Sequence, residues 1–400
     1  MTGPLDGIRV VDLTAVISGP VATMMLADQG ADVIKIESPR GDLMRNVGAI
    51  TRGMSATFLS CNRGKRGLAL DLKTPDGLAI VKDLIATADV FVQNFRPGVI
   101  ERMGLAEDAV RAIRPDIIYV SISGVGESGP YSHQRIYDPV IQALSGLADV
   151  QTDQLTGQPR MVRTIIPDKT TAVTAAQAIT AALFARERLG EGQHVRLAML
   201  DVMVAYLWPE AISGLTFVAN EIDPNQGQMG LDLVFKTTDG YITAGAVSDA
   251  EWQGMSRALG REDLLEDARF ATTASRAKNG AERREIVSAE LRGWASLDIL
   301  ERLDFEDVPS APVLTRRQLL DDEQVKANRI IEIHEDSLLG KVRQPRPAAR
   351  FDRTPAMVRT LAPFLGADNI AILKGLGYAE AKIERLVKDG ILVSKTPAPA

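Results

Sequence analysis

Asp168 stands at the start of a predicted helix, where a carboxylate can either cap the helix or act as a reacting group. It follows Pro167 and precedes an alanine-rich stretch that ends at Gly190, so a long helix is predicted to start beside it. On spacing alone, the commoner role of such an aspartate is to cap the helix by accepting backbone N–H groups. The alternative is a nucleophile that forms a covalent intermediate. The positive end of the helix would then stabilise both the carboxylate and a developing oxyanion. The two roles are compatible.

Two basic segments could bind phosphate groups. Residues 62–66 read Asn-Arg-Gly-Lys-Arg, and residues 94–98 read Asn-Phe-Arg-Pro-Gly, with Arg102 one helical turn further on. Cations beside a strand end and a helix start suit a phosphorylated ligand. The alternative is that these are solvated loop charges, which are common on protein surfaces.

A third polar group contains Arg135, Tyr137 and Asp138. Asp138 followed by Pro139 is typical of a helix start, because proline is favoured at the first helical position. His133 could transfer protons, but a lone histidine in a polar loop is more often only exposed, and geometry is the first test of a base.

Composition excludes several classes of protein. Cys61 is the one cysteine and the three histidines are far apart, so neither a disulfide within the chain nor a metal site is expected. A net charge of -6 argues against a general nucleic-acid binder. The first residues lack a signal-peptide pattern, and the longest uncharged stretch, residues 170–185, is too short for a membrane span. We therefore expect a cytoplasmic enzyme.

The first 125 residues alternate between short apolar runs and helical patterns. The runs predict strands at residues 8–13, 32–36, 68–72, 90–92 and 117–122. Such alternation predicts a mainly parallel, doubly wound α/β sheet. Ligands bind beyond the carboxyl ends of the strands in these sheets. The loops expected at that edge cover residues 14–20, 94–98 and 124–130.

The opening unit resembles a dinucleotide-binding fold, since Glu37 ends its second strand. However, its turn reads Ser18-Gly19-Pro20 and lacks the G-x-G-x-x-G fingerprint that allows close approach of a pyrophosphate. A dinucleotide-dependent oxidoreductase is thus the weaker alternative.

The rest of the chain predicts a second unit and a return segment. After the helix from Pro167, alternating Val195, Leu197 and Met199 predict a strand. We interpret the glycine-rich residues 225–230 as a domain crossing. A β-pair around Asp239-Gly240 follows. The remaining expectations are amphipathic helices over residues 252–320, a mobile Arg- and Pro-rich stretch at 340–355, a helix at 379–389 and a disordered tail at 396–400.

Taken together, these segments resemble the class III (CaiB/BaiF-like) CoA-transferase family, and formyl-CoA transferase in particular. The resemblance covers nearly the whole chain. It rests on motifs that occur in the family's order: residues 4–13 with Gly19-Pro20, residues 30–37, Asn62 with Lys65, residues 70–73 with Pro75, residues 94–98, residues 102–104, residues 124–131, and Asp168 followed by Arg186, Gly190, Gly192-Gln193 and residues 199–201.

The resemblance implies a fold and a set of functional residues. The implied fold is a large Rossmann-like domain with a smaller α+β domain, in an interlocked homodimer. The domains would be residues 1–224 (large, CoA-binding), 225–330 (small) and 331–400 (return to the large domain). Asp168 falls on the family's catalytic aspartate, and its CoA contacts fall on Ile17, Ser18, Arg40, Leu70, Lys73, Asn94, Phe95, Arg96, Arg102, Met103, Arg135 and Tyr137.

The implied activity is transfer of CoA from an acyl-CoA donor to a carboxylic acid through an aspartyl-CoA thioester. It would require no metal and no cofactor beyond CoA as substrate. An α-methylacyl-CoA racemase shares the fold but has a His-Asp pair where this chain has Tyr137-Asp138, and His133 stands four residues too early to replace that histidine. A non-catalytic CoA-binding protein is a further alternative. Of the glycine loop that covers the active site in some members, Gly227 and Gly230 remain. The sequence does not identify the donor acid, the acceptor acid or the pathway.

Overall fold

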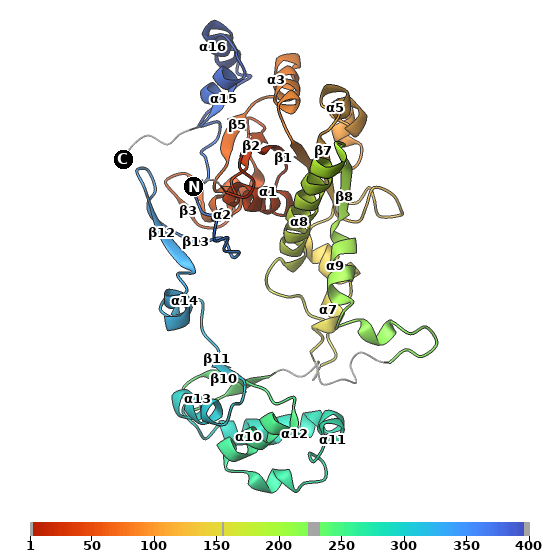
Figure 1. Cartoon of the computed structure of the whole chain (residues 1–400), viewed down its shortest axis with the longest axis vertical. Helices are drawn as coiled ribbons and strands as arrows, with labels where there is room; N and C mark the ends of the chain where they lie inside the picture. Colours follow the sequence, from red (N-terminus) through yellow and green to blue (C-terminus); the bar gives the residue numbers. More distant parts are fainter. Residues whose placement is uncertain (1–2, 154–155, 223–232, 396–400) are drawn as a thin grey trace. The chain divides into compact units, whose positions relative to one another are not determined.

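The computed structural model describes residues 3–153, 156–222 and 233–395. It divides into two compact units, one formed by Met1–Leu207 with Arg329–Ala400 and the other by Trp208–Asn328 (Figure 1). The divisions come after residues 207 and 328, where the sequence pattern suggested 224 and 330. The predicted domain crossing with its glycine loop, residues 225–230, and the tail, residues 396–400, lie outside the described residues.

The large unit is built on a six-stranded parallel sheet with the order β5-β2-β1-β6-β7-β8. The strands are β1 (Arg9–Leu13), β2 (Asp32–Glu37), β5 (Arg66–Ala69), β6 (Val90–Gln93), β7 (Ile118–Ser123) and β8 (His194–Ala198). This confirms the doubly wound α/β prediction, because helical crossovers join parallel neighbours. Two strand predictions extended too far: Leu72 lies beyond β5, and Met199 begins a helix.

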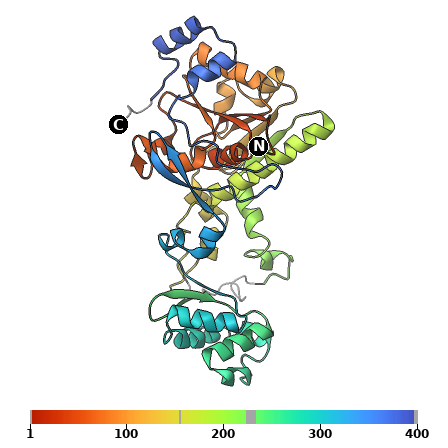
Figure 2. The same cartoon turned by 60° about the vertical axis from the view of Figure 1, so that its left-hand side comes forward.

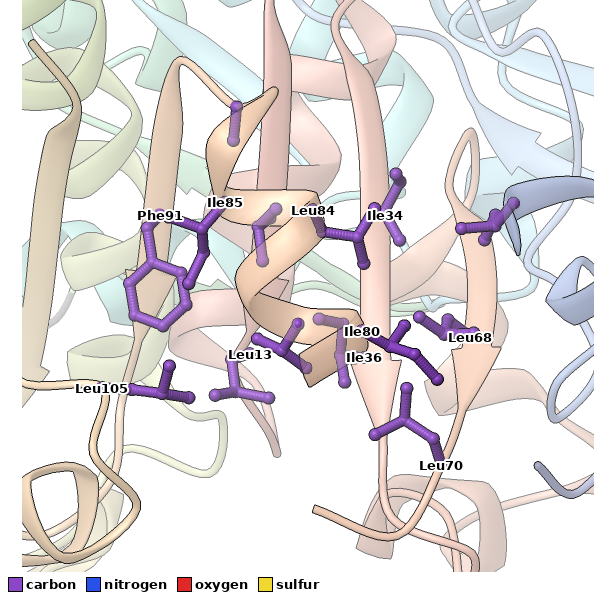
Figure 3. Packing of buried hydrophobic residues seen from close by; sticks show 14 of the residues in the cluster. Leu13, Ile34, Ile36, Leu68, Leu70, Ile80, Leu84, Ile85, Phe91 and Leu105 are labelled. Carbon is purple, nitrogen blue, oxygen red and sulfur yellow. The ribbon is translucent and has the colours of Figure 1, made fainter. Parts of the chain in front are cut away.

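Both faces of the sheet are buried, which explains why its strands read as continuous apolar runs. Val10 and Val11 of β1 point to opposite faces and belong to two different cores. On one face, α3 (Pro75–Ala86) packs its apolar stripe on Leu13, Ile34 and Phe91 (Figure 3). On the other face lie α1 (Ser18–Asp28) and α8 (Ile166–Leu189).

The remaining elements of the large unit connect and cover this sheet. They are η1 (Leu43–Asn46), β3 (Ile50–Thr51), β4 (Met54–Ser55), α2 (Ala56–Asn62), α4 (Val99–Arg102), α5 (Glu107–Ile113), α6 (Asp138–Leu144), α7 (Leu147–Val150), α9 (Met199–Leu207), β12 (Ile331–Asp336), β13 (Gly340–Pro345), α15 (Asn369–Gly375) and α16 (Glu380–Lys388).

The C-terminal segment returns to the sheet formed by the first residues. Strands β12 and β13 form an antiparallel hairpin beside α2, as both views show (Figures 1 and 2). Asn369 accepts a hydrogen bond from the backbone N–H of Ala69 at 2.9 Å. The prediction of a mobile stretch at residues 340–355 is wrong for its first part, because residues 340–345 form the regular strand β13.

The small unit has an antiparallel sheet, β11-β10-β9, covered by helices. The hairpin predicted around Asp239-Gly240 is present, whereas the predicted helical region, residues 252–320, also contains strand β11. The described elements of the small unit are η2 (Ser213–Leu215), β9 (Val234–Lys236), β10 (Tyr241–Ala244), α10 (Asp249–Leu259), η5 (Glu262–Leu265), α11 (Thr273–Lys278), α12 (Gly280–Leu291), α13 (Ser296–Phe305), β11 (Ser310–Pro312), η6 (Gln318–Leu320) and α14 (Glu323–Ala327). In the described part of the chain, no helix is both long and apolar enough to cross a membrane.

Candidate active site

A cavity of about 260 Å³ opens beyond the carboxyl ends of β1, β6 and β7, within the large unit. This is the edge where a parallel sheet is expected to bind its ligand. Seven of the predicted site residues line it together: Ser18, Asn94, Phe95, Arg96, Arg135, Tyr137 and Asp168. They come from four separate stretches of the sequence, which the sheet brings to one place.

Asp168 lies in the first turn of α8, but it does not cap that helix. The N-cap position belongs to Ile165, and no side chain caps it. The N-cap interpretation is therefore wrong, because Asp168 is the third helical residue. The Ser18 hydroxyl and backbone N–H lie close enough to its carboxylate to counteract part of the rise that burial causes in its pKa. Ser18 is the first residue of α1, so the positive end of a second helix faces this anion.

The backbone N–H of Asp168 is bound by a neighbouring carboxylate. Asp138, the first residue of α6, accepts it at 3.2 Å and also accepts the Gln142 side-chain amide at 2.7 Å. A helix starts here as predicted, but Tyr137 is its N-cap, and Asp138 and Pro139 are its first and second residues. The Asp138 carboxylate supports its own helix through Gln142 and α8 through the N–H of Asp168.

The environment of Asp168 favours the neutral acid. Burial, together with the nearby negative charge of Asp138, raises the pKa of Asp168 from its usual 3.8 to about 6, against the opposing hydrogen bonds from Ser18. A carboxylate of higher pKa is more basic and more nucleophilic. At pH 7 it is still about ten-to-one ionised.

The loop between β1 and α1 is held by the half-buried Asn94 and the buried Asp42. The Asn94 side-chain amide binds both backbone groups of Ala15: its oxygen accepts the N–H at 2.8 Å, and its nitrogen donates to the carbonyl at 2.8 Å. Asp42 accepts the N–H of Val16. Sequence reasoning identified Asn94 through the family resemblance but missed Asp42. Loop 94–98 is itself anchored, because Gln93 accepts the N–H of Phe95 at 2.8 Å.

Six predicted CoA contacts do not line this cavity. Leu70 is fully buried in the core and Met103 packs against the same core. Ile17 is buried at the N-cap of α1. Arg40, Lys73 and Arg102 are exposed elsewhere on the large unit. The cavity instead adds Val16, Ile122, Ser123, Gly124, Val125, Gly126, Ser132, Gln134, Ile136, Pro97 and Met199. The glycine-containing loop at 124–130 was the sequence signal for part of this set.

The basic segment 62–66 is not a phosphate site. The Lys65 amine is fully buried and contacts Asp12 at 2.8 Å, and Arg63 pairs with Asp28 at 2.8 Å. Arg66 pairs with Asp32. Lys65 and Arg63 are neutralised inside the fold, so both the phosphate interpretation and the solvated-loop alternative are wrong for these two, whereas the Arg66 side chain is 37% exposed.

Glu37 likewise has a structural partner. Arg45 binds it through two hydrogen bonds, at 2.8 and 2.6 Å, and its side chain is almost fully buried. A carboxylate held in this way is not free to bind a ribose, so its position at the end of β2 gives no support to a dinucleotide site.

Comparison with known proteins agrees with this geometry. The family model of CoA-transferase family III matches residues 5–369. A succinate–glutarate CoA-transferase of Agrobacterium fabrum is 34% identical over 94% of this chain and 96% of its own length. A succinyl-CoA:mesaconate CoA-transferase of Haloarcula hispanica is 36% identical over 86% of each. The crystal structure of a CaiB/BaiF family protein from Brucella suis superposes with a TM-score of 0.81, at 32% identity, covering 94% of this chain and all of that one. The chain therefore belongs to CoA-transferase family III.

Proposed function

We propose that this class III CoA-transferase moves CoA from an acyl-CoA to a carboxylic acid through covalent intermediates on Asp168. The observation that carries the proposal is the Asp168 carboxylate, which lines the cavity together with Ser18 and has its pKa raised to about 6. Burial without a cation makes this carboxylate more reactive than an exposed one.

The proposed chemistry has four balanced steps. The Asp168 carboxylate attacks the thioester carbon of the donor, giving a mixed anhydride and free CoA thiolate. The thiolate attacks the aspartyl carbonyl of the anhydride, which releases the donor acid and leaves an aspartyl-CoA thioester. The acceptor carboxylate then attacks this thioester and expels the thiolate. Finally, the thiolate attacks the acceptor's acyl carbon, which forms the new thioester and regenerates the Asp168 carboxylate. No net proton or electron is exchanged, so no cofactor beyond CoA is required.

Residues around Asp168 support these steps. The Ser18 N–H and hydroxyl hold the carboxylate in one orientation before attack. After the Asp168 carboxylate has been acylated, the same two donors face the aspartyl carbonyl, on which negative charge develops in the second step. Arg96 and Arg135 also line the cavity, and neither pairs with a carboxylate in the described residues. Their charge suits a ligand that carries phosphates and carboxylates.

We infer that the acids transferred are short dicarboxylic acids. Two relatives are named for succinate, glutarate and mesaconate, and two cavity arginines could bind a second carboxylate. Racemisation has less support, because no histidine is among the described residues that line the cavity. Incorporation of solvent deuterium at the α-carbon of an acyl-CoA, without CoA transfer, would favour a racemase instead.

The proposal is tested by trapping the intermediate. The protein is mixed with succinyl-CoA in the absence of acceptor, treated with hydroxylamine, and digested for mass spectrometry. Hydroxylamine converts an aspartyl thioester or anhydride to a hydroxamate, which we expect on the peptide that contains Asp168. A hydroxamate elsewhere, or transfer activity in Asp168→Asn, would overturn the assignment. A screen of CoA esters against carboxylic acids then identifies the pair of substrates.

A further inference from the structure

The loop that leads into α1 contains a strained residue at the edge of the active-site cavity. Val16 has φ of 71°, in the left-handed region, although it is β-branched. This conformation brings the Cβ atom close to the carbonyl oxygen and is rare for such residues. Val16 lines the same cavity as Ser18 and Asp168. Strain of this kind persists only where surrounding contacts impose it.

Asp42 and Lys35 supply those contacts. Both carboxylate oxygens of Asp42 lie 3.2 Å from the backbone N of Val16. Lys35 donates to Asp42 at 3.1 Å and to the carbonyl oxygen of Thr14 at 3.0 Å. The two side chains are at most 1% exposed. The buried Lys35–Asp42 ion pair therefore binds the backbone on both sides of Ala15, at the Thr14 carbonyl and at the Val16 N–H. These contacts impose the turn at Val16.

Asp42 is also fixed from its own side of the loop. Its carboxylate accepts the N–H of Met44 at 3.0 Å, and its backbone N–H donates to Glu37 at 2.8 Å. Glu37 is in turn held by Arg45. A carboxylate with this support cannot follow the Val16 loop if the loop relaxes, so it acts as a rigid anchor.

The path from Asp42 to the reacting carboxylate is short. Val16 precedes Ile17, the N-cap of α1, and Ser18 is the first residue of that helix. The direction in which α1 begins decides where the Ser18 N–H and hydroxyl point. A relaxed Val16 would rotate this helix start away from Asp168.

We infer that Asp42, held by Lys35, is a positioning residue for CoA transfer: it keeps Val16 in the left-handed conformation and thereby aims Ser18 at Asp168. The inference rests on the proposed role of Asp168. A buried pair that served stability alone would be replaceable, since buried ion pairs are often no more stabilising than apolar groups of the same size. The contact with a strained backbone N–H beside the nucleophile distinguishes this pair.

The chain offers a matched control. Asp28 and Arg63 form a second buried pair, 4% and 5% exposed, at the other end of α1. Asp28→Asn removes a buried charge from the same helix without touching the Val16 loop. We expect it to lower thermal stability and leave kcat within about twofold, a change of under 0.5 kcal/mol.

Asp42→Asn tests the inference directly. We expect kcat to fall at least tenfold, with a smaller change in KM for the acyl-CoA, because binding of the substrate is less dependent on Ser18 than attack by Asp168 is. The acid limb of the rate profile should also move to higher pH, since the Ser18 hydrogen bonds that lower the pKa of Asp168 are weakened.

Glycine at position 16 provides the rescue. Glycine adopts positive φ without steric cost, so Val16→Gly in the Asp42→Asn background should recover most of the lost kcat and restore the acid limb. A loss caused by general destabilisation would not be recovered, because removal of the Val16 side chain also removes packing. If Asp42→Asn does not fold, Asp42→Glu takes its place with the same criteria, since it keeps the charge beside Lys35 and only misplaces the oxygens.

Two outcomes would overturn the inference. One is an Asp42 variant with the kcat and acid limb of the native enzyme. The other is a loss of kcat that parallels Asp28→Asn and is not rescued by Val16→Gly. Trapping with hydroxylamine distinguishes failure of the positioning role from failure of the proposed function. If the native chain forms no adduct on Asp168, the assignment of Asp168 as the nucleophile is wrong. If native and Asp42→Asn chains form it at equal rates, only the positioning role fails.

Discussion

Replacing Asp168, the proposed nucleophile, should make the folded protein more stable. The Asp168 pKa is about 6 in the folded chain and 3.8 as a free side chain. The folded state therefore binds the proton more tightly than the unfolded state, so ionisation of Asp168 costs stability. The loss begins as pH rises above 3.8 and is complete above about 6. The neutral amide introduced by Asp168→Asn resembles the protonated acid and incurs no such loss.

The size of the effect follows from the same two values. The difference of about 2 pKa units corresponds to about 3 kcal/mol at 1.36 kcal/mol per unit, an upper value because Asp168 retains some contact with solvent. At pH 8 we expect Asp168→Asn to unfold several degrees above the native chain, and at pH 4 we expect no gain. Both proteins must be compared at one concentration, since association shifts the transition.

Differential scanning calorimetry at pH 4, 6 and 8 measures this. Asp298→Asn is the control, because Asp298 is an exposed carboxylate in the first turn of α13. Its removal loses a favourable interaction with the helix dipole, so a slight decrease in stability is expected. If Asp168→Asn is no more stable than the native chain at pH 8, the carboxylate is not strained by burial and by Asp138, and the argument for its reactivity is refuted.

Three further predictions concern activity and assembly. Asp168→Ala should abolish transfer while CoA affinity, measured by calorimetric titration, stays within a few-fold; retained turnover would contradict the nucleophile. Arg96→Ala should weaken CoA binding by roughly tenfold or more, because charge-assisted phosphate contacts contribute about 1.5–3 kcal/mol. We expect the same of Arg102→Ala, since the Arg102 guanidinium lies beside Gly98, next to the cavity-lining residues 94–97. The loss should shrink for a truncated thioester without the nucleotide, and equal affinities for native and variant chains would reject the assignment. The protein should sediment as an obligate dimer, as the family's interlocked topology implies; a folded monomer at low concentration would argue against this.

Strand positions could be predicted because the sheet is buried on both faces. Val10 and Val11 are both apolar since each faces a core, and such runs are visible without knowledge of the fold. Asp168 and Asn94 were found through the family resemblance, since spacing alone favoured a cap for the former. The edge loops could be placed because parallel strands end together.

Buried charges could not be assigned from the sequence. Lys65 lies in a basic loop segment, but its partner Asp12 is 53 residues away and meets it only once β1 and α2 are packed. Lys35 stands alone in the apolar run of β2, which is a signal of an internal ion pair but does not name the partner. The role of Asp42 depends on the φ angle of Val16, and no local pattern specifies that angle.

Several buried carboxylates of the large unit have a cation partner, whereas Asp168 has none among the described residues. Asp12 is fully buried, yet Lys65 and Lys35 outweigh the effect of burial and hold its pKa below the usual range. Asp42 and Glu37 are paired with cations in the same manner. Asp168 has hydrogen bonds from Ser18 but no cation partner in the described residues, and a second carboxylate, Asp138, stands beside it.

A lysine beside Asp168 would stabilise its charge and also make it a poorer nucleophile, because both effects follow from the same fall in pKa. Lys65 is the cation to consider, because the charges of both Lys65 and Asp168 act on Cys61, which lies between Ser55 and Lys65 in the sequence. Asp12, Asn62 and the carbonyl of Pro20 bind the Lys65 amine at 2.8–2.9 Å and so fix its position. Asp12→Asn should release Lys65 and lower the pKa of Asp168, which would appear as an acid limb displaced to lower pH with a reduced kcat above it. An unchanged acid limb in a folded Asp12→Asn variant would show that Lys65 has no such influence.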